Sequence, residues 1–337
     1  MGLLVGLTFD IKSRKVPKGS PSDLWAEHDS EETISAVVEA LNSGGNKAIR
    51  IGSSKRLLSG LSSLKFDIIF NIAEGISGRN RESEVPVLLD IAGIPYAGSD
   101  ALTLSVSLDK VISKKIFMYH GIPTPAYFEC VKGGRAAVPK GLKFPFIVKP
   151  RYEGSAKGIG PGSVVRNISS LEKQTDEIIR KYGQPALVEE FIDGWEFTVG
   201  IIGNRDPVVL PVVQRHVEIE TGLSSHIFDK TCADKQDSSF MDKRELKYRD
   251  IMGIDAGLEE RIKRFALKAF NGLECRDFAR IDFRVDRKKQ VYMLEINPLP
   301  SLARDDYFSM VAELMGITYE RMINMMFAAA LDRCGLR

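Results

Sequence analysis

Side chains that can bind a metal ion recur on two strands predicted within residues 279–297. Successive residues of a strand point to opposite faces, so Asp282 lies on one face of the first strand, and Glu295 and Asn297 share one face of the second. A tight turn at residues 287–289 brings the two strands together. Carboxylate and amide oxygens suit Mg²⁺, which takes its remaining ligands from water and phosphate. The hairpin therefore predicts a magnesium site.

The alternative interpretation of this hairpin is a surface feature with a polar outer face. Leu294 and Ile296 argue against it because they indicate a buried strand, and Pro298 then ends that strand abruptly. Arg280 shares a face with Asp282, which puts a cation beside the carboxylates.

A lysine and a glycine-rich segment predict contact with phosphate. Lys149 stands at the end of a buried strand, residues 146–149, where its ammonium group can reach phosphate oxygens. The glycines of residues 153–162 let backbone N–H groups approach such oxygens closely. The segment lacks the Gly-Lys-Ser/Thr ending of a Walker A loop. Flexibility alone is the other explanation of such a loop, and the preceding lysine favours binding.

Two glutamates on strands predicted within residues 186–202 could contact a nucleoside. Glu189 lies near a strand end, where its carboxylate could accept hydrogen bonds from an adenine amine or from ribose hydroxyls. Glu196 follows a turn at Asp193 and Gly194. The alternative for either glutamate is the ordinary polarity of a hairpin.

The pattern of predicted elements changes about one third of the way along the chain. Strands at residues 3–9, 47–51 and 66–71 alternate with helical segments such as 31–42, which indicates a parallel sheet covered by helices. After a boundary near residues 104–113, closely spaced strands indicate an antiparallel α+β unit. The predicted domains are an amino-terminal α/β domain (1–107), a central domain with the glycine-rich loop (108–194), and a carboxyl-terminal domain with the metal site and a lid (195–337).

Composition excludes several classes of partner. Among 337 residues, 47 Lys and Arg against 45 Asp and Glu give a net charge of +2, which provides no footprint for nucleic acid or an anionic membrane. The longest apolar stretches, such as 208–213 and 325–331, are much shorter than a membrane span. The four cysteines lack metal-binding spacing, which is typical of free thiols in a reducing cytoplasm. We expect a cytoplasmic protein that acts on small molecules.

In combination and in this order, these features resemble the ATP-grasp superfamily and, within it, the D-alanine–D-alanine ligase family. The similar motifs extend over nearly the whole chain and are Phe70-Asn-Ile-Ala-Glu-Gly75, Ile94-Pro-Tyr-Ala-Gly98, Leu108-Asp-Lys110, Val148-Lys-Pro150, Glu153-Gly-Ser155, Val188-Glu-Glu190, Glu196-Phe-Thr-Val199, Ala279-Arg-Ile-Asp282 and Glu295-Ile-Asn297. The resemblance implies an ATP-grasp fold with α/β and α+β parts and a Rossmann-like amino-terminal domain. It also implies ATP-dependent joining of a carboxylate to an amine through an acyl-phosphate, for cell-wall biogenesis.

The resemblance assigns roles to residues of this chain. Lys110 and Lys149 match the two phosphate-contacting lysines, and Arg280 matches the arginine that stabilises charge on the attacked acyl group. The other implied ATP contacts are Glu153, Gly154 and Ser155 in the glycine-rich loop, and Glu189, Glu190, Phe191, Glu196, Phe283 and Leu294 around the nucleoside. Ser155 and Ser301 join Arg280 as implied catalytic residues. Asp282, Glu295 and Asn297 are the implied ligands of two Mg²⁺ ions, for which Mn²⁺ can substitute.

The motifs define the substrate contacts less fully. An amino-terminal acidic residue normally holds the ammonium group of the first substrate, and Glu27, Asp29 and Glu31 remain alternatives. Asp306 falls near the serine that contacts the acceptor carboxylate in the family. An anion at this position repels a carboxylate, so the acceptor can differ from D-alanine.

Two further departures from the family pattern concern the acyl-transfer site and the lid. Ser301 stands where the family has a glycine whose backbone helps to hold the tetrahedral intermediate. Lys230, a candidate substrate contact in the predicted lid at residues 218–255, belongs to only a loose match of the usual lid pattern.

Three hypotheses about function follow. The first is a ligase that makes a D-alanyl-D-alanine-like dipeptide, and the second is a related ligase for other amino acids or a natural-product acid. The third is a non-catalytic ATP-binding regulatory protein, which would show no ATP turnover. The resemblance also suggests a homodimer formed through the amino-terminal domain.

Overall fold

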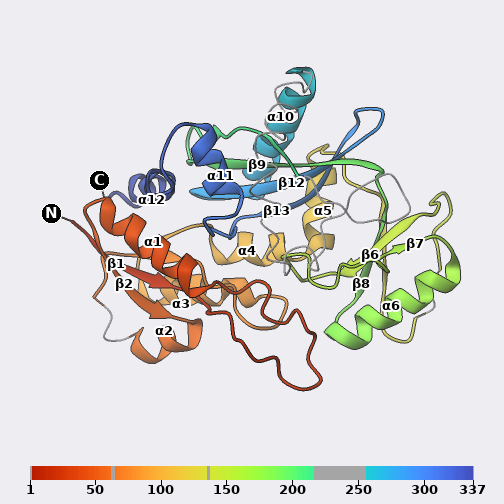
Figure 1. Cartoon of the computed structure of the whole chain (residues 1–337), viewed down its shortest axis with the longest axis horizontal. Coiled ribbons are helices and arrows are strands. Elements are labelled where there is room, and N and C mark those ends of the chain that lie inside the picture. The colour runs from red at the N-terminus through yellow and green to blue at the C-terminus, as the bar shows by residue number, and fades with distance from the viewer. Residues whose placement is uncertain (1, 62–64, 135–136, 216–255, 337) are drawn as a thin grey trace.

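The computed structural model describes residues 2–61, 65–134, 137–215 and 256–336, which form three β-sheets around a common centre (Figure 1). Helices α4 (Ala101–Leu108) and α5 (Lys110–Tyr119) run between the sheets. The predicted lid, with Lys230, lies outside the described residues.

The first sheet is parallel, as the alternation of strands and helices predicted, with strand order β2-β1-β3-β4. Its elements are β1 (Leu4–Thr8), α1 (Glu31–Ser43), β2 (Lys47–Gly52), α2 (Ser54–Gly60), β3 (Ile68–Asn71), the 3₁₀ turn η2 (Arg81–Ser83), α3 (Glu84–Ala92) and β4 (Tyr96–Ala97). The Ser30 side chain starts α1 by accepting the Thr33 N–H at 3.2 Å. Because neighbouring strand residues face opposite ways, Phe70 packs against α1 while Ile69 packs against α2 and α3.

The second sheet is antiparallel, with strand order β5-β8-β6-β7. Its elements are β5 (Tyr127–Cys130), β6 (Phe146–Pro150), β7 (Val164–Val165), α6 (Ile168–Tyr182) and β8 (Ala186–Glu190). Helix α6 covers one face by burying Leu171 and Ile178 against Phe146 and Val188. The glycine-rich loop follows β6 directly, so the sheet fixes where this loop begins.

The third sheet is also antiparallel, as predicted for this part of the chain, with strand order β10-β9-β12-β13 and β11 paired to β9. Its elements are β9 (Gly194–Ile202), β10 (Val208–Val209), β11 (Val213–Arg215), α10 (Ala256–Gly272), β12 (Phe278–Asp286) and β13 (Val291–Asn297). Helices α5 and α10 cover its apolar face, where Ile281, Phe283 and Val285 are buried. On the opposite face Ile202 and Phe278 belong to another hydrophobic core, and the polar side chains of Arg280 and Asp282 follow farther along β12.

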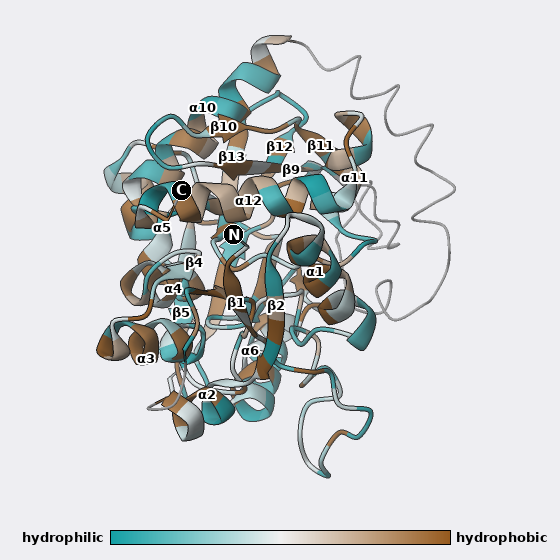
Figure 2. Ribbon diagram, turned by 90° about the vertical axis from the view of Figure 1, so that its left-hand side faces the viewer, coloured by the Kyte–Doolittle hydropathy of each residue, from teal (hydrophilic) through white to brown (hydrophobic). Residues whose placement is uncertain are grey.

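The chain ends with two helices that return to the first sheet. Helices α11 (Tyr307–Leu314) and α12 (Tyr319–Cys334) share a hydrophobic core with α1 and the first sheet, and Figure 2 shows α12 beside α1. The strands of the three sheets fall within residues 4–97, 127–190 and 194–297. The domain limits at 107 and 194 stay a prediction.

Two predictions from composition concern the described part of the chain. None of its helices combines the length and apolar character that a membrane span needs. Cys130, Cys275 and Cys334 are free thiols, as predicted, and Cys232 lies outside the described residues.

Candidate active site

The predicted oxygen ligands meet on the polar face of the third sheet. In the β12–β13 register Asp282 is opposite Glu295, and Arg280 is opposite Asn297. The Asn297 amide donates to Asp282 at 3.2 Å, and the Thr198 hydroxyl donates to the same carboxylate at 2.8 Å. Among the described residues no three His, Cys, Asp or Glu side chains form a metal-binding group. Two carboxylates and one amide oxygen fit Mg²⁺, which keeps several non-protein oxygen ligands.

Arg280 lies between two carboxylates next to these ligands. Its guanidinium group is 3.2 Å from Asp282 and 3.7 Å from Asp306, the residue that caps the start of α11. Burial opposes the charge on Arg280, but these two carboxylates outweigh burial and raise the pKa of Arg280 above its usual value. The side chain is therefore a permanent, oriented cation at the edge of the oxygen ligands.

Lys110 connects the oxygen ligands to the glycine-rich loop. It is the first residue of α5, and its ammonium group lies 3.3 Å from Glu295 and donates to the carbonyl of Glu153. Burial alone would raise the pKa of Glu295, but Lys110, Lys149 and Arg280 lower it to about 2. Glu295 is therefore an ionised carboxylate at every physiological pH.

Lys114, Lys149 and Glu189 form a buried cluster on the same side of the site, which we call the phosphate-side cluster. The Glu189 carboxylate lies 2.9 Å from Lys114 and 2.8 Å from Lys149. Burial lowers the pKa of Lys114 to about 8 despite the attraction of Glu189. For Lys149 burial also acts to lower the pKa, but Glu189 and Glu295 outweigh it and raise the value. Two lysines against one carboxylate leave this cluster with a positive charge that can meet phosphate.

The residues predicted around a nucleoside lie between the second and third sheets. Glu189 is fully buried and paired with two lysines, whereas Glu190 is exposed. The Arg284 guanidinium group lies 5.3 Å from the Phe191 ring centroid and 3.7 Å from the Glu196 carboxylate. The carboxylates of Glu189 and Glu196 therefore both have cationic partners in this structure.

A β-bulge determines how Phe283 and Leu294, which were also predicted around the nucleoside, are arranged. Asp282 pairs with Glu295 but Phe283 pairs with Met293, so Leu294 is an extra residue in β13. Phe283 is fully buried in the core of the third sheet, and Leu294 is partly exposed next to Glu295. Strict alternation, as assumed from the sequence, would have put Leu294 and Glu295 on opposite faces of the sheet.

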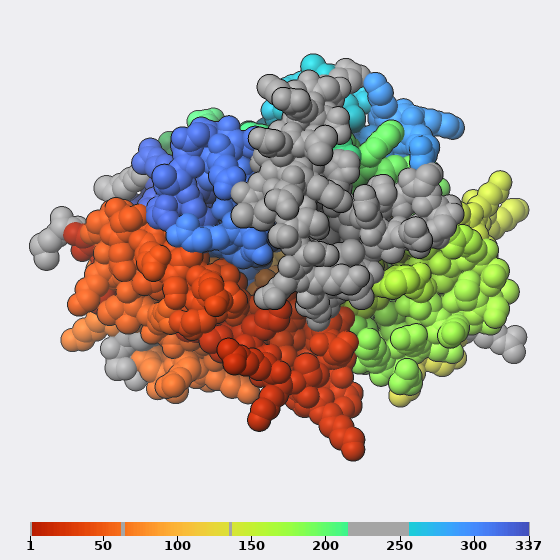
Figure 3. Space-filling view, in the orientation of Figure 1, coloured from red at the N-terminus to blue at the C-terminus, as the bar shows by residue number. Residues whose placement is uncertain are grey.

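The glycine-rich loop reaches across to the loops of the first sheet. Ser155 at its tip is exposed, and Gly154 donates its N–H to Glu27 at 2.6 Å. Figure 3 shows the two regions in contact, with the red amino-terminal segment against the green residues of the central part. The structure thus brings together Glu27, which was predicted as a substrate contact, and Glu153 and Gly154, which were predicted as ATP contacts.

The other acidic alternatives near Glu27 lie in different surroundings. Glu31 is more than half exposed and pairs with Arg50 on the surface. Asp29 is partly buried, and this loss of solvent contact together with the nearby Asp10 raises its pKa to about 7. The Ser301 hydroxyl makes a local contact, because it accepts the N–H of Ala303, two residues farther along the same loop, at 3.4 Å.

Several residues of the site were absent from the sequence predictions. Lys114 follows Lys110 by one helical turn, so the i, i+4 spacing could have identified it as a second cation on the same helix face. Arg81 and Lys157 contact Glu27 at 2.6 Å and 2.9 Å, and no local spacing connects them because the contacts span 54 and 130 residues.

Comparisons with known proteins show the family to which the chain is similar. The family model described as D-ala D-ala ligase C-terminus matches residues 116–328. A D-alanine–D-alanine ligase of Carboxydothermus hydrogenoformans is 30% identical over 320 residues, covering 89% of this chain and 93% of the relative. The uncharacterized protein y4sG of Sinorhizobium fredii is 33% identical over 325 residues, covering 91% of this chain and 89% of that protein.

A solved structure extends the similarity to the fold. The D-alanine–D-alanine ligase of Bacillus anthracis, determined in complex with ATP, superposes with a TM-score of 0.72 at 22% identity and covers 98% of both chains. The family model and the relatives together show that the chain belongs to the D-alanine–D-alanine ligase family and is an ATP-dependent carboxylate–amine ligase with the ATP-grasp fold.

Proposed function

We propose that the protein joins two amino acids, with D-alanine as the first candidate for both, through an acyl-phosphate intermediate. The observation that carries this proposal is the continuous line of contacts from Lys110 through Glu295 and Asp282 to Arg280. It combines cations for phosphate, oxygen ligands for a metal ion and a cation for an acyl oxygen within one site.

In the first step a carboxylate oxygen of one substrate attacks the γ-phosphorus of ATP. The bond from that phosphorus to the bridging oxygen breaks, and ADP leaves. Lys110 and Lys149 neutralise charge on the phosphoryl oxygens, and the amides of the glycine-rich loop cover them. Asp282, Glu295 and Asn297 would hold magnesium, which when bound supplies further positive charge next to the phosphates.

In the second step the amine of the other substrate attacks the acyl carbon. The carbon–oxygen bond to phosphate breaks, inorganic phosphate leaves, and the nitrogen loses a proton as the amide forms. Arg280 is positioned to stabilise the negative charge that develops on the acyl oxygen. Water must be excluded during both steps because it would hydrolyse the acyl-phosphate.

A specific observation supports a second candidate, a ligase whose acceptor is not D-alanine. Asp306 lies 3.7 Å from Arg280 and takes up part of the positive field that an acceptor carboxylate would use. An acceptor without a carboxylate, or with an added cation, suits this position better.

The test is phosphate release from Mg-ATP with a panel of single and paired amino acids, amino-acid amides and diamines, with products identified by mass. Release with D-alanine alone, and a D-alanyl-D-alanine mass, supports the first candidate. Release only with carboxylate-free acceptors, and recovery of D-alanine use in Asp306→Ser, supports the second. No turnover with any member of the panel would contradict both.

We further propose a cytoplasmic homodimer. Exposed apolar side chains on α3 and α4, namely Val87, Ile91 and Leu102, support an interface on these helices. Figure 2 shows where the two helices lie. Light scattering should give twice the chain mass, and Ile91→Glu with Leu102→Glu should give the monomer mass. A monomeric wild type would contradict the proposal.

A further inference from the structure

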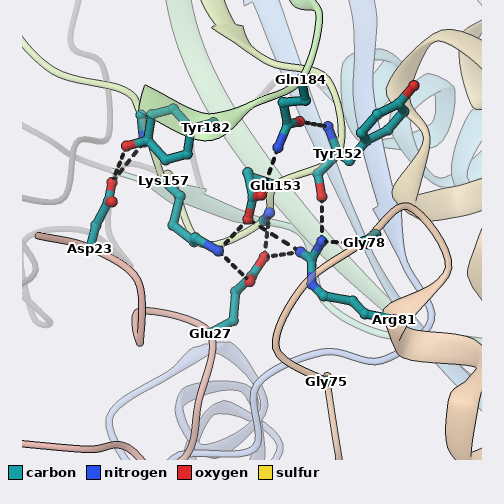
Figure 4. A network of polar contacts seen from close by, with 12 residues as sticks. Asp23, Glu27, Gly75, Gly78, Arg81, Tyr152, Glu153, Lys157, Tyr182 and Gln184 are labelled. Carbon is teal, nitrogen blue, oxygen red and sulfur yellow. Dashed lines mark hydrogen bonds and ion pairs between the residues drawn. The ribbon is translucent and has the colours of Figure 1, made fainter. Parts of the chain in front are cut away.

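Arg81 is the centre of a buried polar network that joins three segments of the chain (Figure 4). Its guanidinium group donates to the Glu27 carboxylate at 2.6 Å and to the carbonyl of Tyr152 at 2.8 Å. Tyr152 directly precedes the glycine-rich loop, and Arg81 itself belongs to η2, which directly precedes α3. Arg81 therefore holds the base of the loop against the loops of the first sheet.

The same network holds the loop from within. Glu27 accepts the Gly154 N–H at 2.6 Å and pairs with Lys157 at 2.9 Å, while Lys157 also pairs with Glu153. Beyond the tip of the loop, Asp23 accepts the Gly158 N–H at 2.9 Å. Carboxylates of the amino-terminal segment thus hold the loop on both sides of its tip.

What remains available is the tip of the loop. Ser155 and Ala156 have φ angles of 46° and 55°, and their N–H groups have no hydrogen-bond partner among the described residues. Consecutive residues in this left-handed region are unfavourable for side chains other than glycine and persist only where surrounding contacts impose them. Two successive free N–H groups in such a turn can donate hydrogen bonds to phosphate oxygens.

The charges of the network are balanced. Arg81 and Lys157 face Glu27 and Glu153, so two cations match two carboxylates. We call these four residues the loop cluster. Burial raises the pKa of the neighbouring Glu82 to about 8, which leaves it mostly neutral at pH 7. The loop cluster therefore has little net charge with which to attract a ligand, in contrast to the phosphate-side cluster.

We propose that Arg81 is a positioning residue for nucleotide binding: through Glu27 and the Tyr152 carbonyl it imposes the loop conformation that presents the Ser155 and Ala156 amides to phosphate. This inference rests on the proposed ATP chemistry but concerns a residue that does not touch the nucleotide. It assigns Glu27 to the loop, because two cations and one N–H already bind its carboxylate.

The test measures binding of a non-hydrolysable ATP analogue with Mg²⁺ by calorimetry, together with thermal unfolding, for four variants. Arg81→Met and Glu27→Gln each should weaken binding, roughly tenfold to hundredfold for loss of a charged hydrogen bond. Arg81→Lys keeps the charge but cannot reach both partners, so it should fold and still bind more weakly. Arg50→Met is the matched control, because Arg50 forms an exposed pair with Glu31 and should leave binding unchanged.

The double variant Arg81→Met with Glu27→Gln separates positioning from simple charge pairing. It restores the charge balance, so thermal stability should recover relative to Arg81→Met, while analogue affinity stays low because the loop contacts remain absent. Recovery of both properties would overturn the proposal in favour of a structural ion pair. Wild-type affinity in Arg81→Met, with a raised KM for the carboxylate or amine alone, would also overturn it. Failure of the wild type to bind the analogue would instead count against the proposed function.

Discussion

The phosphate-side cluster and the loop cluster are both buried groups of ion pairs, but they differ in charge balance and in what they connect. Lys114, Lys149 and Glu189 come from α5 and the second sheet and carry more positive than negative charge. The loop cluster joins the first sheet's loops to the glycine-rich loop and is neutral as a group. The comparison suggests that excess charge marks a group awaiting a ligand, whereas balanced charge marks a group that positions the chain.

The largest effect is expected where the metal ligands meet the phosphate-side cluster. Glu295→Gln should lower magnesium-dependent turnover roughly 10²–10⁴-fold, because it removes one of two carboxylates from the oxygen ligands. Unfolding temperature should change little, as it should for the surface control Glu260→Gln. A Glu295→Gln enzyme with near wild-type turnover would rule out the metal assignment.

Arg280→Ala should have the next largest effect. We expect kcat to fall roughly a hundredfold or more while KM for ATP changes by less than about threefold, because the partner of Arg280 develops charge only in the transition state. Steady-state kinetics with saturating substrates separate the two parameters. Equal losses in kcat and in ATP affinity would indicate that Arg280 serves only as the ion-pair partner of Asp282 and Asp306.

Lys149→Met should weaken ATP binding by roughly tenfold to hundredfold because it removes the excess charge of the phosphate-side cluster. Lys157→Met in the loop cluster should also weaken ATP binding. The loss of affinity should depend less on salt than the loss in Lys149→Met, because Lys157 acts by positioning the loop rather than by attracting the phosphates directly. Calorimetric titrations at two ionic strengths make the comparison. Equal salt dependence in both variants would contradict the distinction between the clusters.

The smallest effect concerns a proton. With a pKa of about 8, Lys114 is largely neutral above pH 8 in the free protein, and a bound phosphate anion should raise that pKa again. ATP binding at pH 8.5 should therefore take up a proton, whereas binding at pH 6.5, where Lys114 is already charged, should take up none at this residue. Calorimetry in buffers of different ionisation enthalpy measures this uptake, and Lys114→Met is the control. Equal uptake in wild type and Lys114→Met would assign the proton elsewhere.

The sequence predicted the parts of the fold that depend on local pattern. Uninterrupted apolar strands alternating with helices indicated the parallel first sheet, and a tight turn at residues 287–289 indicated the β12–β13 hairpin. The hairpin was also expected to bring Asp282 near Glu295 and Asn297, and the structure places it opposite Glu295 and within a hydrogen bond of Asn297. The bulge at Leu294 escaped prediction because it depends on the partner strand, where Phe283 pairs with Met293.

Contacts between segments that are distant in the sequence also could not be predicted. Glu27 was identified as an acidic candidate, but its partners Arg81 and Lys157 are joined to it only after the glycine-rich loop folds against the first sheet. Buried ion pairs of this kind have no local periodicity, so charge type alone left Glu27, Asp29 and Glu31 equivalent. The structure separates them by burial and by partner.

The most direct measurement for a ligase that acts through an acyl-phosphate follows one oxygen atom. A carboxylate substrate identified by the panel is labelled with ¹⁸O in its carboxyl group, and the released phosphate, the nucleotide product and the amide are analysed by mass. We predict ADP as the nucleotide and one ¹⁸O atom in the phosphate for each amide formed. Unlabelled phosphate, or label found in AMP, would contradict attack of the carboxylate on the γ-phosphorus.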